Sequence, residues 1–233
     1  MRVHIIGKGI VGQATGEGFR RFGHEVVYTD QGDDHTVAGH IHFICTPEDT
    51  VLGLVQAMRG RREPIIIRST VAPGTTSQAT KRLGRPLWHN PEFLQQATAE
   101  QDFLFRDYAI VGGPAPLPEP LLRLYQDMGV KVYACDALES EYAKLILNAY
   151  FAMQVCFWNE LKEHLDTVPV NSHKVARLVA LDERVSKHAA YMHGHPYGGR
   201  CLPKDMRTLL AAMGDKAGLM SMLDPERQPA LVA

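Results

Sequence analysis

The first 30 residues constrain the fold more than any other stretch of the chain. An apolar run, "RVHII" (2–6), leads directly into "GKGIVG" (7–12) and a helical pattern over residues 10–22. Glycines at this spacing allow a tight turn from a strand into a helix, and they let the backbone approach a pyrophosphate group. A second apolar run, "HEVVYT" (24–29), completes a strand–helix–strand unit. The unit predicts a Rossmann-type fold, although an incidental glycine-rich turn has the same local pattern.

The alternation of short apolar runs and helical segments continues as far as residue 135. Further strands are predicted at 40–45, 63–69, 85–89, 108–112 and 131–135, and further helices at 48–59, 75–83 and 118–128. Strands that alternate with helices form a parallel sheet with helices on both faces. The fold class is therefore α/β.

The pattern changes after residue 136. Residues 138–165 form a long helical segment without glycine or proline, and shorter helices are predicted at 172–188 and 204–213. A helix as apolar as the long one is normally buried on several sides. We expect a homodimer packed through residues 145–161. The predicted division is a Rossmann-type domain (1–136), a small helical domain (137–223) and a poorly ordered tail (224–233).

Composition excludes several classes of protein. The 233 residues carry a net charge of −1 and the sequence pI is about 6.8, so no strongly basic face for nucleic acid is expected. The N-terminus has no signal-peptide layout, and no apolar run approaches the length of a membrane span. We expect a cytoplasmic protein with no membrane partner.

The cysteines and histidines do not follow a metal-binding pattern. Cys45, Cys135, Cys156 and Cys201 are scattered, which is typical of reduced thiols in a reducing compartment. Three histidines lie close together near Cys201 and could form a zinc site with it, but their spacing fits no standard zinc pattern. They are His188, His193 and His195. No metal is predicted.

Asp30 indicates which dinucleotide binds. It follows the second strand, where a carboxylate can accept hydrogen bonds from an adenosine ribose and would repel the 2′-phosphate of NADP. The predicted cofactor is NAD.

Two further patterns are ambiguous by themselves. Lys144 and Asn148 are four residues apart, so both lie on one face of the long helix. They could bind a substrate oxygen together, or they could be a lysine that extends to solvent and a solvated asparagine. Cys201 precedes Pro203, a natural first residue of a helix, and Lys204 is close by. A helix N-terminus and a cation both favour a reactive thiolate, but an isolated cysteine can equally be a small apolar residue.

Six segments, in order, make the chain resemble the UDP-glucose/GDP-mannose dehydrogenase family. They are "GKGIVG" (7–12), "FICTPED" (43–49), "RSTVAPGTT" (68–76), "HNPEFLQQATAEQDF" (89–103), "EYAKLILNAYFAMQVCFWNEL" (141–161) and "YGGRCLPKD" (197–205). The resemblance implies oxidation of a nucleotide-sugar primary alcohol to the acid, with two NAD+ consumed. Cys201 would carry a thiohemiacetal and then a thioester.

The resemblance also implies the site residues. The catalytic residues would be Cys201, Lys144, Asn148, Asp205, Thr70 and Glu92. The cofactor-binding residues would be Gly7, Gly9, Ile10, Val11, Gly12, Asp30, Thr46, Pro47, Ser69 and Thr70. The substrate-binding residues would be Phe93, Leu94, Lys144, Asn148, Tyr197, Gly198 and Lys204.

The chain departs from the family pattern in several places. It resembles a truncated form without the C-terminal nucleotide-binding domain, and the family's helical insert is reduced to "QGDDHTVAG" (31–39). Gln96 stands where the family has a glutamate, and Tyr108 where it has an arginine. His195, Pro196 and Arg200 alter the approach to Cys201. Binding energy would have to come from a partner that supplies the missing domain, from a smaller substrate, or from weak binding.

Two other functions remain open. One is a two-electron dehydrogenase that resembles the 3-hydroxyisobutyrate or 6-phosphogluconate group and does not need Cys201. The other is a catalytically weak NAD-binding module that acts with a partner.

Overall fold

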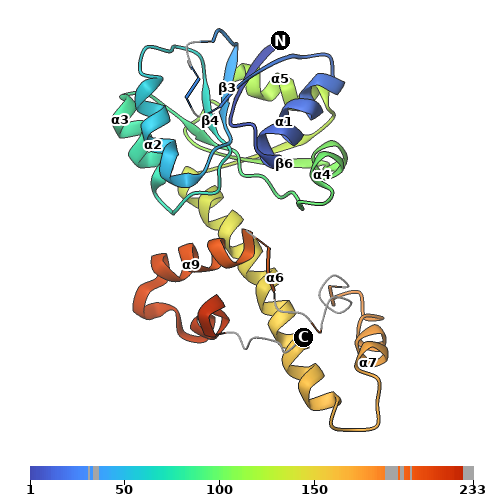
Figure 1. Cartoon of the computed structure of the whole chain (residues 1–233). Helices are drawn as coiled ribbons and strands as arrows, with labels where there is room; N and C mark the ends of the chain where they lie inside the picture. The colour runs from blue at the N-terminus through green and yellow to red at the C-terminus, as the bar shows by residue number, and fades with distance from the viewer. Residues whose placement is uncertain (31, 34–36, 187–193, 195–196, 200, 228–233) are drawn as a thin grey trace. The chain divides into compact units, whose positions relative to one another are not determined.

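The computed structural model describes residues 1–30, 32–33, 37–186, 194, 197–199 and 201–227 (Figure 1). The chain divides into two compact units, Met1–Lys144 and Leu145–Ala233.

The first unit is built on one seven-stranded sheet with the order β2-β1-β3-β4-β5-β6-β7. The strands are β1 (Arg2–Ile6), β2 (Glu25–Thr29), β3 (Ile41–Ile44), β4 (Ile65–Ile67), β5 (Trp88–His89), β6 (Tyr108–Gly112) and β7 (Lys131–Cys135). All neighbouring strands are parallel except β5 and β6, which pair antiparallel through His89 and Gly112. The α/β fold class is confirmed, with this antiparallel pair as a correction.

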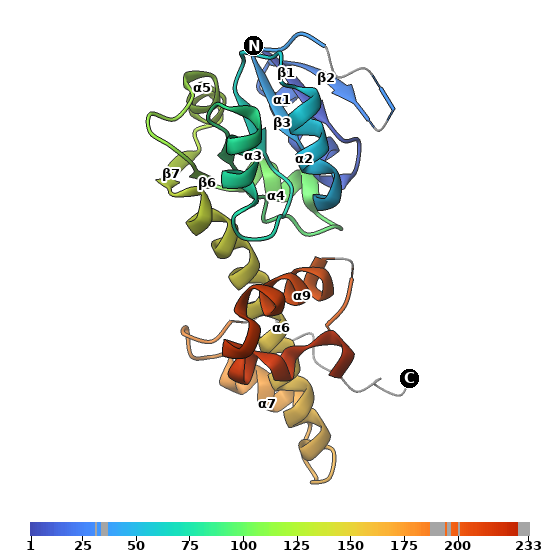
Figure 2. The same cartoon turned by 90° about the vertical axis from the view of Figure 1, so that its left-hand side faces the viewer.

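Helices cover the sheet on both faces, as Figures 1 and 2 show. On one face lie α1 (Ile10–Arg21), α4 (Ala99–Phe105) and α5 (Glu119–Asp127), and on the other lie α2 (Glu48–Ala57) and α3 (Thr75–Leu83). The strand residues alternate between two apolar clusters, so that Ile5 packs on the α1 side and Ile6 on the α2 side. Each such fully buried side chain contributes about 1.5–3 kcal/mol. Helix α4 was not predicted.

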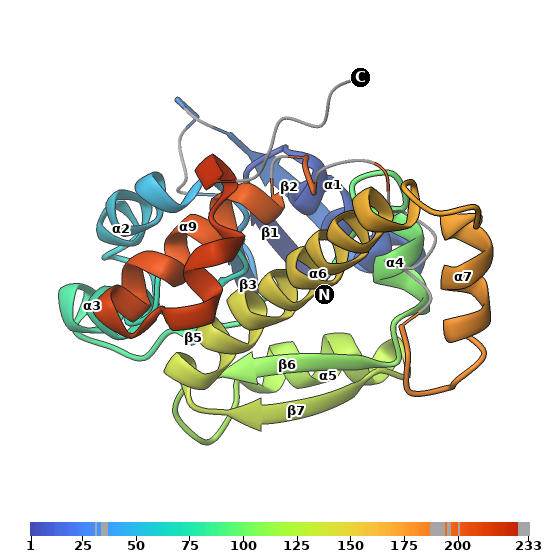
Figure 3. The ribbon, with the colours of Figure 1, turned by 90° about the horizontal axis from the view of Figure 1, so that it is seen from below.

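The second unit contains most of the long helix α6 (Ala137–Leu165), which begins in the first unit. It also contains α7 (Ser172–Val179), α9 (Cys201–Met213) and three 3-10 helices: η1 (Gly214–Lys216), η2 (Gly218–Leu223) and η3 (Pro225–Arg227). In Figures 1 and 3, α7 and α9 lie on opposite sides of α6. None of the described helices combines the length and the apolar character that a membrane crossing requires.

The structure corrects two predicted helices of the second unit. The helix predicted over 172–188 ends at Val179. The helix predicted to start at Lys204 starts at Cys201, so that Cys201 is its first residue and Pro203 lies within its first turn. Proline is tolerated there because first-turn amides have no partner within the helix.

Candidate functional site

The glycine-rich turn between β1 and α1 requires glycine at two of its three positions. Gly7 has a φ of 107°, and a Cβ built on it would lie 2.6 Å from the carbonyl oxygen of Cys45. A Cβ on Gly12 would lie 1.9 Å from the carbonyl oxygen of Gly7. A Cβ on Gly9 would meet nothing within 4 Å. The turn is therefore closed on its inner side and open at Gly9, which is the geometry that fits a pyrophosphate.

Asp30 lies beside this turn, at the carboxyl end of β2. The Gly7 amide donates to the carbonyl oxygen of Thr29 (2.8 Å), which joins the turn to the strand end. The Asp30 amide donates to Oδ2 of Asp33 (2.7 Å), and the same oxygen lies 3.4 Å from Nζ of Lys8. Asp30 therefore lies at the strand end next to the glycine turn, and the ribose contact predicted for it stays a prediction.

A cleft of about 360 Å³ flanks the start of α1. It is lined by Ile10, Gln13, Ala14, Glu17 and residues 96–101. Ile10 is the predicted cofactor residue on its wall, and Gln96 also lines it. Gln96, which stands where the family resemblance implies a glutamate, therefore lies in the cleft at the start of α1.

The ends of β3 and β4 are joined by Ser69. Its Oγ donates to the carbonyl oxygen of Thr46 (2.6 Å), next to Pro47, which caps α2. Thr70 follows and is partly buried. Four of the predicted cofactor residues, Thr46, Pro47, Ser69 and Thr70, thus lie together at the carboxyl edge of the sheet, where open α/β sheets bind their ligands.

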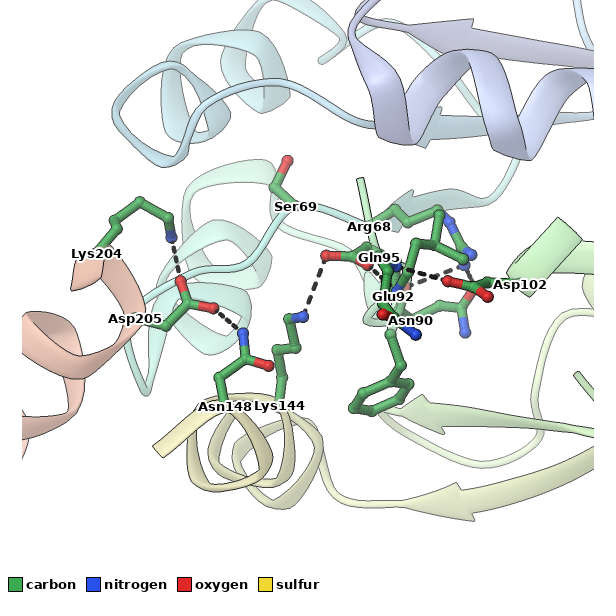
Figure 4. Close-up of polar contacts among 12 residues, drawn as sticks. Arg68, Ser69, Asn90, Glu92, Gln95, Asp102, Lys144, Asn148, Lys204 and Asp205 are labelled. Carbon is green, nitrogen blue, oxygen red and sulfur yellow. Dashed lines mark hydrogen bonds and ion pairs between the residues drawn. The ribbon is translucent and has the colours of Figure 1, made fainter. Parts of the chain in front are cut away.

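A buried ion pair joins the segment after β5 to α6. Nζ of Lys144 lies 3.1 Å from Oε1 of Glu92, and the two side chains are 4% and 6% exposed. Oε2 of Glu92 accepts a hydrogen bond from the Leu94 amide (2.6 Å). Nζ of Lys144 also lies 5.5 Å from the centre of the Phe93 ring. Figure 4 shows Lys144 directed at Glu92. The structure therefore brings two predicted catalytic residues and two predicted substrate residues together.

Sequence reasoning missed the residues that support this pair. Buried Arg68 donates to Thr15 Oγ1 (2.8 Å) and to Asn90 Oδ1 (2.6 Å). Glu141, one turn before Lys144, accepts from the amides of Gly74 (2.6 Å) and Thr76 (2.7 Å) at the start of α3. The two bonds of Glu141 go to backbone amides, and those of Arg68 go to neutral side-chain oxygens, so neither leaves a charge pattern in the sequence.

His89 is a further buried polar residue of the first unit. Its Nδ1 lies 2.7 Å from Oγ of Ser140 on α6, and its Nε2 lies 3.3 Å from the carbonyl oxygen of Ser69. Burial lowers the pKa of His89 to about 3, because the imidazolium would lose its hydration. His89 is therefore neutral at physiological pH, and it links α6 to the loop that carries Thr70.

In the second unit, Asp205 is the centre of the polar contacts. Its Oδ2 accepts from Nδ2 of Asn148 (2.5 Å), and its Oδ1 lies 2.6 Å from Nζ of Lys204. The Asp205 side chain is 1% exposed, whereas that of Lys204 is 48% exposed. Figure 4 shows both partners directed at the carboxylate. Three predicted site residues are thus joined in one cluster.

Cys201 and Tyr197 differ in their exposure to solvent. Cys201 is exposed at the first turn of α9, and the four cysteines, all among the described residues, form no disulfide. Tyr197 is buried, and its hydroxyl donates to the carbonyl oxygen of Leu223. Burial raises the pKa of this phenol. Tyr197 therefore holds the C-terminal 3-10 segment, and Gly198 is exposed.

The three histidines of the possible zinc site, His188, His193 and His195, lie outside the described residues. Pro196 and Arg200 lie outside them as well. Within the described residues, no group of three or more His, Cys, Asp or Glu side chains is placed to hold a metal ion.

Comparisons with known proteins place this geometry in context. Residues 138–226 match the model of the UDP-glucose/GDP-mannose dehydrogenase family, central domain. A UDP-glucose 6-dehydrogenase of Rickettsia conorii is 31% identical over 153 residues, which is 62% of this chain and 35% of the relative. A GDP-mannose 6-dehydrogenase of Pseudomonas aeruginosa is 28% identical over 184 residues, which is 73% of this chain and 41% of the relative. The chain thus spans well under half the length of these relatives.

Solved structures support the fold. The structure of a UDP-glucose dehydrogenase from Pyrobaculum islandicum matches 95% of this chain and 66% of its own with a TM-score of 0.83, at 23% identity. A UDP-D-MAnNAc dehydrogenase from Pyrococcus horikoshii matches with the same TM-score at 21% identity.

Proposed function

Because the chain belongs to the UDP-glucose/GDP-mannose dehydrogenase family, we propose that it oxidises the primary alcohol of a nucleotide sugar to the carboxylic acid with NAD. The observation that supports the proposal is the meeting of predicted catalytic and substrate-binding residues within each unit. Glu92 meets Lys144 in the first unit, and Asp205 meets Asn148 and Lys204 in the second.

NAD fits the residues of the first unit. The open backbone at Gly9 would take the pyrophosphate, and Asp30 would take the ribose. NAD held by these residues would supply the hydride acceptor for both oxidations. Asp30 would exclude the 2′-phosphate of NADP by like-charge repulsion.

Cys201 has the covalent role in the proposal. Its thiolate sulfur adds to the carbonyl carbon of the aldehyde and gives a thiohemiacetal. Oxidation of that carbon leaves a thioester. Water then adds to the thioester carbon, the carbon–sulfur bond breaks, and the thiolate returns. Overall, one alcohol, two NAD+ and one water give one carboxylate, two NADH and three protons. The exposed position of Cys201 in the first turn of α9 supports this role.

The polar residues have supporting roles. Lys144 and Asn148 would stabilise the oxygen anion that develops on the reacting carbon. Glu92 and Thr70 would hold the hydrolytic water, and Asp205 would accept a proton through water. Phe93 and Leu94 would contact the substrate from the same segment as Glu92.

The assembly is also a proposal. Ile146, Tyr150 and Phe157 are exposed on α6 at helical spacing and would form part of a homodimer interface. A partner that supplies a nucleotide-binding domain remains an alternative source of substrate affinity. Light scattering at micromolar concentration distinguishes a monomer from a dimer.

Counting NADH per sugar tests the proposal. Limiting UDP-glucose, UDP-N-acetylglucosamine, UDP-N-acetylmannosamine and GDP-mannose are supplied separately with saturating NAD+. Two NADH per sugar is the expected result and identifies the substrate. One NADH per sugar would favour the two-electron dehydrogenase. Bound NAD+ without turnover would favour the module that acts with a partner.

A further inference from the structure

Two arginines donate hydrogen bonds to the segment Asn90–Leu94, which contains Glu92. Arg68 donates through Nη1 to Oδ1 of Asn90 (2.6 Å). Arg106, at the end of α4, donates through Nη2 to the carbonyl oxygen of Phe93 (2.5 Å). Both guanidinium groups and Glu92 border one small cavity of about 20 Å³, which has room for about one water molecule.

Arg106 makes three further contacts that fix its own position. Its Nη1 donates to the Tyr108 hydroxyl (2.8 Å). Its guanidinium carbon lies 5.1 Å from the centre of the Tyr108 ring and 5.4 Å from that of Phe93. The two rings are themselves 6.3 Å apart. A planar guanidinium suits these combined hydrogen-bonding and stacking contacts, and a lysine ammonium does not.

The same aromatic ring contacts the catalytic lysine. Nζ of Lys144 lies 5.5 Å from the centre of the Phe93 ring and 3.1 Å from Glu92. Phe93 therefore has cationic contacts with both Arg106 and Lys144. Movement of the Phe93 backbone would carry the adjacent Glu92 with it and loosen its ion pair.

The two arginines differ in what their replacement would do. Arg68 is 4% exposed inside the core of the first unit, so its removal would disturb packing as well as hydrogen bonds. Arg106 is partly exposed, so its replacement should disturb the core less than that of Arg68. It also hydrogen-bonds Tyr108, the residue that stands where the family pattern has an arginine.

We propose that Arg106 is a positioning residue that holds the Phe93 backbone and thereby the Glu92–Lys144 ion pair. The proposal deepens the proposed function, on which its kinetic consequence rests. Its geometric consequence does not depend on any substrate.

Chemical labelling of Lys144 tests the geometric consequence. Acetic anhydride acylates accessible amines, and the rate at Lys144 is measured by peptide mass spectrometry relative to that at Lys162 of α6. We expect Arg106→Met to raise the relative rate about tenfold, as local opening exposes a buried group. Arg106→Lys should give an intermediate rate. Tyr108→Phe, which removes one acceptor and keeps the stacking, is the matched control and should stay within about twofold of the parent.

Each variant is labelled at the same temperature interval below its own Tm, so that global unfolding does not contribute. An Arg106→Met variant labelled at the parent rate would overturn the proposal. So would a Tyr108→Phe variant that matches Arg106→Met.

Steady-state kinetics test the kinetic consequence, with whichever nucleotide sugar the parent protein oxidises as the substrate. Arg106→Met should lower kcat about tenfold and leave the Kd for NAD+ unchanged, because a displaced ammonium stabilises the transition state less. An unchanged kcat would contradict a positioning role. If the parent oxidises no nucleotide sugar, the proposed function fails and the labelling still decides the role of Arg106.

Discussion

The two units each contain a lysine–carboxylate pair, but the first unit buries both members and the second buries only the carboxylate. In the first unit, Lys144 and Glu92 are both almost inaccessible to solvent. In the second, Asp205 is buried and its partner Lys204 is half exposed. The first arrangement holds a cation in a low-dielectric environment. The second holds a carboxylate there and leaves its cation hydrated.

This difference decides what each pair contributes. Removing one member of a buried pair leaves an uncompensated charge and costs about 3–5 kcal/mol, whereas a solvent-exposed partner contributes about 1 kcal/mol or less. Asp205 also keeps the Asn148 amide as a second partner. Lys144 is therefore expected to be essential to both the fold and the reaction, and Lys204 to neither to the same degree.

Replacing each lysine by methionine should show the largest difference between the two pairs. Lys144→Met should lower kcat by about 100- to 1,000-fold through lost oxyanion stabilisation, and should lower the free energy of unfolding by about 3–5 kcal/mol. Lys204→Met should cost about 1 kcal/mol or less. Urea denaturation and steady-state kinetics measure the two effects. Equal losses in stability would mean that burial does not distinguish the pairs.

A double variant separates stability from catalysis in the first unit. Lys144→Met with Glu92→Gln removes the unpaired carboxylate, so most of the lost stability should return. The activity should stay low, because the ammonium is still absent. Recovery of both would show that the lysine acts only through stability.

The glycine turn provides the next largest contrast. Gly12→Ala would place a methyl group 1.9 Å from the Gly7 carbonyl oxygen, and should destabilise the first unit by about 2–4 kcal/mol. Gly9→Ala meets nothing within 4 Å and should leave the unfolding free energy within about 0.5 kcal/mol. It should nevertheless weaken NAD+ binding about tenfold, measured by calorimetry, because the backbone must approach the pyrophosphate. A Gly9→Ala variant with unchanged affinity would move the cofactor away from this turn.

The smallest expected effect is a pH dependence of stability in the first unit. Nδ1 of His42 lies 2.9 Å from Nδ1 of His4 on the neighbouring strand, and burial lowers the pKa of His42 from 6.5 to about 4. The unfolded state therefore binds more protons between these values, so stability falls as pH falls from about 6.5 towards 4. Between pH 7 and pH 5 we expect His42 to account for a loss of about 2 kcal/mol.

Tryptophan fluorescence measures this loss of stability in each unit, because Trp88 lies in the first unit and Trp158 in the second. Fluorescence of Trp88 is followed in Trp158→Phe, and that of Trp158 in Trp88→Phe. The urea midpoint reported by Trp88 should fall more on acidification. Equal shifts would contradict a first-unit origin.

Much of the fold could be predicted because its signals are local. β1, β6, β7 and α3 have the predicted boundaries, since glycine, proline or charged residues interrupt the apolar pattern at their ends. Helix α4 was missed because seven residues with a polar start give no helical period. The antiparallel direction of β5 could not be predicted, because a two-residue strand carries no directional signal.

The site was predictable only in part, for a different reason. Glu92, Lys144, Asn148 and Asp205 are ordinary residues in isolation and became candidates through the family resemblance. Arg68, Arg106 and Glu141 were missed because they bind backbone groups or neutral side-chain oxygens, which tertiary structure alone brings within reach. The register of α9 was also missed, because Pro203 is tolerated at more than one first-turn position.

The mass of the peptide that contains Cys201 is the most direct test of the proposed covalent chemistry at that residue. The Glu92→Gln variant, in which hydrolysis should be slowed, is mixed with NAD+ and UDP-glucose and quenched in acid during turnover. We expect a thioester-linked sugar nucleotide on Cys201, and no adduct in Cys201→Ser. Two NADH per sugar with Cys201 unmodified throughout, or a Cys201→Ser variant with the parent's activity, would contradict it.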